Sequence, residues 1–304
     1  MKLNMIFGSD SDWDKVKEGV TVATKCISGL EVEVDFASAD NTSVKVDRIA
    51  SKIKCESIRN KVYISGAGMS NVLTGVLKSQ ANLGDLIIGI ALDDSKTYGM
   101  SSWLSTSEKP PGNPVLMVGL NDSYSALNIS YRFLSGIDKN EVVVFGGTGE
   151  REIFPSDRSK LEDSLEEIEL HYQVKKLNQL DADDIVLTVF SMVDHEQGKG
   201  YLNLVDNVLR KGQGIQIGMA GTNIGLPSAH YLHCLINTET TGIVGIQAYQ
   251  NAAHLAARII RDENSLSIIG QKKNEKAHKL NQHPGLLVSG GEVVEKGIYD
   301  GEVE

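Results

Sequence analysis

Short apolar runs alternate with amphipathic stretches along the first 135 residues of the chain. Runs rich in Val, Ile and Leu predict strands, and stretches with apolar residues three or four positions apart predict helices. The predicted strands are residues 4–7, 31–36, 62–65, 86–92 and 115–119, and the predicted helices are residues 14–26, 44–55, 70–81 and 124–134. This alternation predicts a parallel sheet with helices on both faces, whose ligands bind at the carboxyl ends of the strands.

The same pattern starts again after residue 140. A run of Val and Phe at 142–145 leads into Gly146-Gly147, as the first strand leads into Gly8. Further strands are predicted at 170–174, 185–190 and 215–220, with no helix directly before the second of these. We therefore predict an α/β protein with two tandem three-layer domains and parallel sheets. The predicted domains are residues 1–138 and 139–262, followed by a C-terminal helix and extension over 263–304.

Composition narrows the functional classes. A length of 304 residues with 41% hydrophobic residues suits two ordinary domains. The net charge of −10 argues against nucleic acid or an anionic membrane as a partner. The N-terminus does not resemble a signal peptide, and no apolar run approaches the roughly 20 residues that span a bilayer, so we expect a cytoplasmic protein. Cys26, Cys55 and Cys234 lack the spacing of a disulfide framework or a zinc site.

The first strand ends in a loop with several anion-binding features. Gly8 permits a tight turn, and the hydroxyls of Ser9 and Ser11 stand where the next helix begins. Backbone N–H groups at a helix N-terminus together with short hydroxyls can cradle a phosphate, and Asp12 could accept from a ribose hydroxyl. The same residues also fit an ordinary strand end followed by a helix N-cap.

Four blocks in sequence order resemble the PurE family, the aminoimidazole ribonucleotide carboxylases and carboxyaminoimidazole ribonucleotide mutases of purine synthesis. They are Gly8-Ser9-Asp10-Ser11-Asp12-Trp13, Ser38-Ala39-Asp40-Asn41-Thr42, the glycine-rich stretch 65–75, and the late loop and helix 99–115. The resemblance implies that the two predicted domains are PurE-like, with a flavodoxin-like fold. It also implies transfer of a carboxyl group on an imidazole ribonucleotide, without a metal or an organic cofactor. The substrate-binding residues that it implies are Ser9, Ser11, Asp12, Ser38, Asn41, Gly66, Ala67, Gly68 and Ser102.

The departures from the family pattern concern its proton chemistry and its phosphate binding. Asp40 stands where the family has a catalytic His, Asn41 replaces its phosphate-binding Arg, and Val72 replaces a second His. An Asp becomes a general base near neutral pH when burial or a like charge raises its pKa. We therefore take Asp40 as the candidate proton carrier, and we expect a catalytic Asp40 to be buried beside Ser9 and Asp12.

The second half offers a second candidate and a second resemblance. Residues 242–259 are similar to the closing strand and helix of the family, and the later stretch also resembles the PurE-like domain of LarB, a carboxylase of a pyridine dinucleotide. Glu239 stands where LarB-type sequences carry a cysteine. His195 lies directly after a predicted strand and is a candidate catalytic group, although a polar loop is the simpler interpretation. His230 and His233 lack a third ligand, so no metal site is predicted.

The resemblance also bears on assembly. PurE-family proteins are homo-octamers with sites between subunits, which implies about four tandem chains in a closed assembly. The nucleotide loop of one copy could then work with His195 of another copy across an interface. Three functions stay open: a PurE-type carboxylase or mutase, a nucleotide-binding relative without activity, and a LarB-like carboxylase of a pyridine nucleotide.

Overall fold

The computed structural model describes residues 1–55, 60–68, 71–107, 109–148, 154–190, 195–221, 238–281, 286–289 and 292–295. The first half contains β1 (Lys2–Phe7), α1 (Asp10–Cys26), β2 (Glu31–Phe36), α2 (Ser43–Cys55), β3 (Val62–Ala67), α3 (Val72–Gln80), β4 (Leu86–Ala91), α4 (Met100–Ser107), β5 (Leu116–Val118) and α5 (Ser123–Ser135). The second half contains β6 (Val142–Phe145), α6 (Pro155–Glu166), β7 (Tyr172–Lys175), η1 (Leu177–Gln179), β8 (Ile185–Phe190), α7 (His195–Leu209), β9 (Ile215–Ala220), β10 (Thr241–Ile243) and α9 (Tyr249–Ile259). The C-terminal part contains α10 (Glu263–Asn281) and the strands β11 (Leu286–Ser289) and β12 (Glu292–Glu295).

Both halves contribute to one ten-stranded sheet with the order β2-β1-β3-β4-β5-β10-β9-β8-β6-β7. Counted inward from its outermost strand, each half has the same strand order, with β6 to β10 in the places of β1 to β5. Neighbouring strands are parallel except at the centre, where β5 and β10 pair antiparallel and Met117 lies opposite Ile243. The α/β fold is thus confirmed. The sequence did not predict one continuous sheet. Because β5 and β10 are antiparallel, the carboxyl ends of the strands in one half lie at the opposite edge of the sheet from those in the other half.

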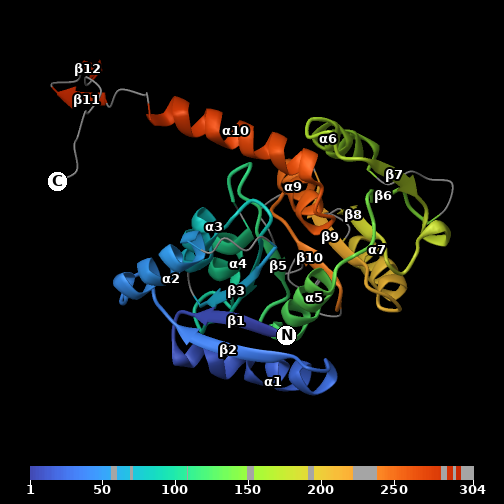
Figure 1. Cartoon of the computed structure of the whole chain (residues 1–304), viewed down its shortest axis with the longest axis horizontal. Helices are drawn as coiled ribbons and strands as arrows, with labels where there is room; N and C mark the ends of the chain where they lie inside the picture. The colour runs from blue at the N-terminus through green and yellow to red at the C-terminus, as the bar shows by residue number, and fades with distance from the viewer. Residues whose placement is uncertain are drawn as a thin grey trace.

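The helices form two layers, one on each face of the sheet (Figure 1). On β4, Leu86 and Ile88 belong to the largest buried cluster, whereas Ile87 between them belongs to another cluster, because successive strand residues point to opposite faces. Helices α1, α5, α6 and α9 contribute to the first cluster. Helices α2, α3, α4 and α7 contribute to the clusters on the other face.

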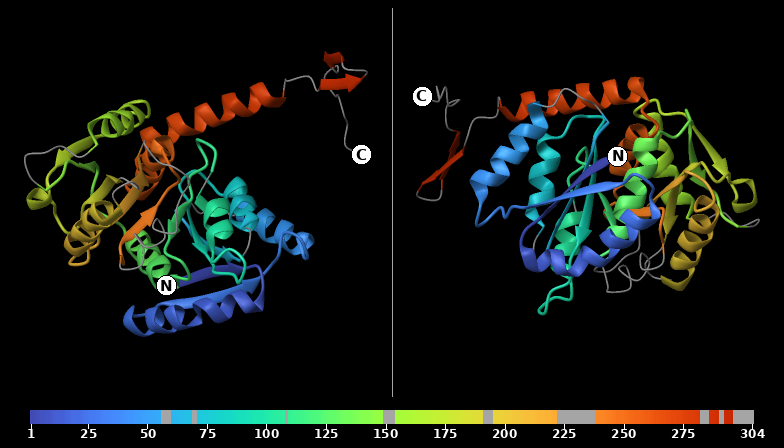
Figure 2. Two further views of the ribbon diagram at one scale, coloured as in Figure 1. Left: turned by 180° about the vertical axis from the view of Figure 1, so that it is seen from behind. Right: turned by 60° about the horizontal axis from the view of Figure 1, so that its bottom comes forward.

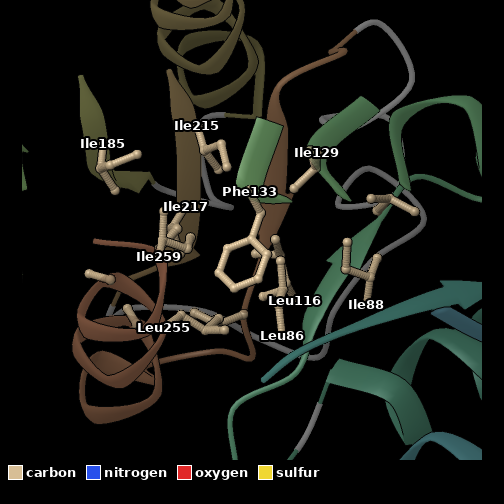
Figure 3. Close-up of a cluster of buried hydrophobic side chains, with 14 of the residues drawn as sticks. Leu86, Ile88, Leu116, Ile129, Phe133, Ile185, Ile215, Ile217, Leu255 and Ile259 are labelled. Atoms are coloured by element: carbon tan, nitrogen blue, oxygen red, sulfur yellow. The ribbon is translucent and has the colours of Figure 1, made fainter. Parts of the chain in front are cut away.

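The largest cluster crosses the junction between the halves (Figure 3). Phe133 of α5 lies among Leu86 and Leu116 of the first half and Ile217 and Ile259 of the second, and each of these side chains is almost completely buried. A core shared in this way stabilises both halves together, because separating them would expose the apolar surface of each.

Two buried arginines cross the same junction in opposite directions. An Nη of Arg132 on α5 donates to the carbonyls of Gly212 at 2.7 Å and Gly214 at 2.9 Å. An Nη of Arg258 on α9 donates to the carbonyl of Asp85 at 2.8 Å. Gly214 directly precedes β9 and Asp85 directly precedes β4, which hold the same place in the two strand orders. Such reciprocal contacts fit a tandem repeat, while the domain boundaries at 138 and 262 stay predictions.

Some element boundaries differ from the sequence prediction. Helix α1 begins at Asp10 rather than at residue 14, because Ser9 caps it and the acidic loop residues form its first turn. The C-terminal extension contains an antiparallel hairpin of β11 and β12, which lies beyond the end of α10 in Figure 2. Within the described residues, no helix is both long enough and apolar enough to cross a bilayer.

Candidate functional site

Three strand ends of the first half meet at one edge of the sheet. The N–H of Gly8 after β1 donates to the carbonyl of Gly66 in β3 at 3.1 Å, and the N–H of Ala37 after β2 donates to the carbonyl of Phe7 at 2.8 Å. These bonds place the loops after β1, β2 and β3 side by side. The structure therefore brings together the predicted residues of the first three blocks at the carboxyl edge, where ligands of such sheets bind.

The hydroxyls of Ser9 and Ser11 belong to the first turn of α1. Ser9 Oγ accepts from the N–H of Asp12 at 3.3 Å, which is an N-cap bond, and lies 2.9 Å from Ser11 Oγ. Ser11 is exposed and Ser9 is half-buried. The N-cap interpretation is thus confirmed, and the pair still presents hydroxyl groups at the helix N-terminus.

Asp12 is buried and shares a lysine with a second carboxylate. Lys15 Nζ lies 3.9 Å from Asp12 Oδ1 and 3.7 Å from Asp93 Oδ1, and it also donates to the carbonyl of Asp93. Asp93 follows β4, so this network joins the ends of two strands to α1. A methyl group at Gly68 would lie 3.4 Å from Asp12 Oδ1, which places the glycine loop after β3 directly against the carboxylate. The sequence analysis missed Lys15 and Asp93.

The glycine-rich strand end has a packing role. A Cβ at Gly66 would lie 3.0 Å from Phe7 Cε1 and 3.1 Å from the carbonyl oxygen of Ile90, so a larger residue would be tightly packed between the neighbouring strands β1 and β4. Gly66 and Ala67 belong to β3 and are buried, whereas Gly68 lies in the loop. The predicted contact of this loop with carbon dioxide stays a prediction.

Ser102 lies beneath the site rather than on its surface. Its hydroxyl donates to the carbonyl of Ala67 at 2.5 Å and accepts from the N–H of Leu92 at 3.2 Å. The side chain is fully buried. Ser102 thereby ties the end of β3 to the end of β4, and its predicted contact with substrate stays a prediction.

The loop after β2 carries the replaced family residues. Ser38 Oγ accepts from the N–H of Asn41 at 3.2 Å, and Thr42 Oγ1 accepts from the N–H of Ser38 at 2.8 Å, so the loop is held by its own side chains. Asp40 is exposed. The buried carboxylate expected of a proton carrier is not found at Asp40 in the single chain.

Asp94, next to Asp93, organises the following loop. Its carboxylate accepts from the hydroxyl of Thr97 and from the N–H groups of Thr97 at 2.7 Å, Lys96 at 2.8 Å and Gly99 at 3.2 Å. These hydrogen bonds, led by the one from the Thr97 hydroxyl, lower the pKa of Asp94 to about 2. Asp94 therefore adds a permanent negative charge at this edge.

His195 lies at the other edge of the sheet. It is the first residue of α7, which follows β8, and β8 runs antiparallel to β1 in the common sheet. Within one chain, Ser9 and His195 therefore cannot form a common site, and a joint role would need two chains. His230, His233 and Cys234 lie outside the described residues, and only the backbone of His195 lies within them.

The second half contains a counterpart of the Asp12–Lys15 pair. Asp157 is the third residue of α6, as Asp12 is of α1, and Lys160 Nζ lies 3.8 Å from Asp157 Oδ1. Here the hydroxyl of Tyr249 donates to Asp157, and burial together with this carboxylate raises the pKa of Tyr249. The described residues contain no group of three or more side chains that could hold a metal ion.

Comparisons with known proteins identify relatives of the first half of the chain. Residues 2–142 match the AIR carboxylase family. The chain is 32% identical over 136 residues to an N5-carboxyaminoimidazole ribonucleotide mutase of Pyrococcus abyssi, covering 44% of this chain and 74% of the relative. It is 28% identical over 156 residues to a protein of the same name from Methanocaldococcus jannaschii, covering 50% of this chain and 93% of the relative. A phosphoribosylaminoimidazole carboxylase of Candida glabrata is 31% identical over 134 residues, covering 43% of this chain and 22% of the relative. The chain therefore belongs to the AIR carboxylase family, the PurE family that its four sequence blocks resemble.

Proposed function

We propose that the chain is a carboxylase or mutase that moves a carboxyl group on an aminoimidazole ribonucleotide. The observation that carries the proposal is the convergence of Ser9, Asp12 and Gly68 at one sheet edge, in a chain of a family named for this chemistry. Backbone donors and hydroxyls at the start of α1 suit an anionic or hydroxyl-bearing ligand, and buried Asp12 suits a ribose hydroxyl.

The reaction needs a group that moves a proton on the imidazole carbon. Joining carbon dioxide to that carbon forms a C–C bond and releases the C–H proton to a base. Asp40 is the candidate within the chain, and its exposure leaves room for a neighbouring subunit to cover it. His195 of a second chain is the alternative base, since the topology separates His195 and Ser9 within one chain. Both assignments assume the predicted closed assembly of about four chains.

A nucleotide-binding protein without catalysis is the second candidate function. The exposure of Asp40 and the replacement of the family His and Arg residues favour it. Such a protein would bind the ribonucleotide at the same loops and leave it unchanged. The two functions therefore differ in turnover but not in binding.

The test is an ultraviolet assay with carboxyaminoimidazole ribonucleotide, and with aminoimidazole ribonucleotide plus bicarbonate, with ligand-induced melting shifts measured in parallel. We expect turnover that falls at least about 100-fold in Asp12→Asn, because the variant loses the charged acceptor beside the glycine loop. Asp14→Asn is the matched control, since Asp14 is exposed on the same helix and pairs with Lys17. A melting shift without turnover would establish the binding protein instead, and the absence of both signals would contradict both functions.

A further inference from the structure

The candidate site carries an excess of negative charge. Asp12, Asp93 and Asp94 stand at the strand ends, and exposed Asp40 lies in the neighbouring loop. Lys15, the cation between them, already lies within 4 Å of both Asp12 and Asp93. A ribonucleotide adds a phosphate with a charge of about −1.5 to −2 at neutral pH. The N–H groups and hydroxyls at the start of α1 can bind part of this phosphate, but the four carboxylates repel it, so its binding also needs cations close to the site.

A cationic groove begins at the edge of this site. It has a volume of about 660 Å³ and runs along α2 from Asn41 and Thr42 past Lys45 and Arg48 to Lys52. Asn41 belongs both to the groove and to the loop that the strand ends bring beside Ser9. Three of the side chains lining the groove are cations, and none of the lining residues is acidic.

The helical repeat explains the cationic stripe. The side chains of Val46, Ala50 and Ile53 are buried and fix which face of α2 packs on the sheet. Lys45 and Arg48 are three positions apart and Lys52 follows four positions later, so the three cations lie on one face. Side chains on a helix lean toward its N-terminus, which in α2 is the end next to Asn41.

Of these three cations, Arg48 has the fewest ionic partners among the described residues. Lys45 Nζ lies 3.7 Å from Asp35 Oδ1, and Lys52 contributes to the lowered pKa of Glu33. Arg48 is exposed, and it forms no ion pair with another residue in the part of the chain that the structure describes. A guanidinium can bind two phosphate oxygens at once, which a single ammonium group cannot do in the same planar geometry.

We propose that the groove along α2 binds the phosphate of the ribonucleotide and that Arg48 is its principal contact. The inference rests on the proposed function, because it places the phosphate of that substrate. Asn41 marks the junction at which the ligand passes from the groove to the strand ends. The groove thereby makes the site selective for a phosphorylated ligand over its nucleoside.

The test compares two probes, aminoimidazole ribonucleotide and the riboside that lacks its phosphate. Calorimetric titration of the full chain gives Kd for each probe in the wild type, in Arg48→Gln and in Arg48→Lys. We expect Arg48→Gln to weaken ribonucleotide binding about 10- to 100-fold and to leave riboside binding unchanged. Arg48→Lys should fall between, because it keeps the charge and loses the planar fork. Lys17→Gln, which removes an exposed cation of α1, should bind both probes as the wild type does.

The outcomes separate this inference from the proposed function. If the wild type binds the ribonucleotide and Arg48→Gln binds it equally well, the groove is not the phosphate site and the proposed function stands. If Arg48→Gln weakens both probes to the same extent, Arg48 does not read the phosphate, and the inference fails. If the wild type binds neither probe, the proposed function fails together with the inference.

Discussion

Buried basic side chains gather where α3, α9 and α10 meet. Lys78 of α3 is 2% exposed, and His254 and Arg258 of α9 are 5% and 1% exposed. Burial, together with the charges of Arg258 and Lys273, lowers the pKa of Lys78 to about 6, and the attraction of Asp85 opposes this shift. Burial and Arg258 likewise lower the pKa of His254 to about 4. Lys78 is therefore mostly neutral at physiological pH, which is unusual for a lysine.

We expect Lys78→Met to stabilise the protein at pH 7. The unfolded chain protonates Lys78 below about pH 10.5, whereas the folded chain does so below about pH 6. Between these values the unfolded state binds more protons, so the free energy of unfolding of the wild type rises with pH. The variant removes this dependence and should gain on the order of a few kcal/mol at pH 7, with the gain shrinking toward pH 10.

Thermal unfolding from pH 6 to pH 10 measures this gain. Lys25→Met, which replaces an exposed lysine at the end of α1, should show the pH dependence of the wild type. Parallel pH profiles for Lys78→Met and the wild type would contradict the assigned burial of the charge.

Residue patterns identified part of the candidate site. Ser9, Asp12 and Gly68 follow predicted strands, and strand ends of a parallel sheet meet at one edge, so their proximity follows from local pattern. Lys15 could have been found from its spacing of three after Asp12 on one helix face. Its second partner, Asp93, could not, because that contact depends on how two distant segments pack.

At the scale of elements, the apolar runs predicted the strands of both halves to within a few residues. The antiparallel pairing of β5 with β10 was not predicted, since each strand has three residues and its local pattern does not specify a neighbour. The pairing depends on close packing at the seam. A Cβ at Gly242 of β10 would lie far inside the van der Waals distance of Leu116 Cγ on β5.

We expect Gly242→Ala to destabilise the protein by about 1–3 kcal/mol, because the added methyl group overpacks the seam against Leu116. Leu116→Ala alone should cost about 2–5 kcal/mol through the cavity that it leaves. The double variant should cost less than the sum, since each change relieves the strain or the cavity of the other. Urea unfolding of the four proteins measures the coupling, and additive costs would show that the two side chains do not share this space.

At the scale of the whole molecule, the two halves form one structural unit. The common sheet, the core around Phe133 and the reciprocal arginines Arg132 and Arg258 all cross the junction. The sequence predicted two similar halves, but it did not predict that they share one sheet and one core. Amphipathic periodicity shows which face of an element is buried, and it does not show whether the covering residues come from the same domain or from the next.

The chain should therefore unfold in one transition, with equal calorimetric and van't Hoff enthalpies. Arg132→Met should lower the Tm by several degrees without splitting the transition, because the carbonyls of Gly212 and Gly214 lose their buried donor. The exposed variant Arg48→Gln should keep the Tm of the wild type. Two separate transitions in the wild type would indicate that the halves are independent domains.

The antiparallel seam also determines from which side other molecules reach the chain. The carboxyl ends of β1 to β5 and those of β6 to β10 lie at opposite edges of the sheet. A molecule at the strand ends of the first half would therefore not cover the strand ends of the second half. Two molecules that bound at these two edges would thus not compete for space, and we expect substitutions at one edge to leave the shape of the other unchanged.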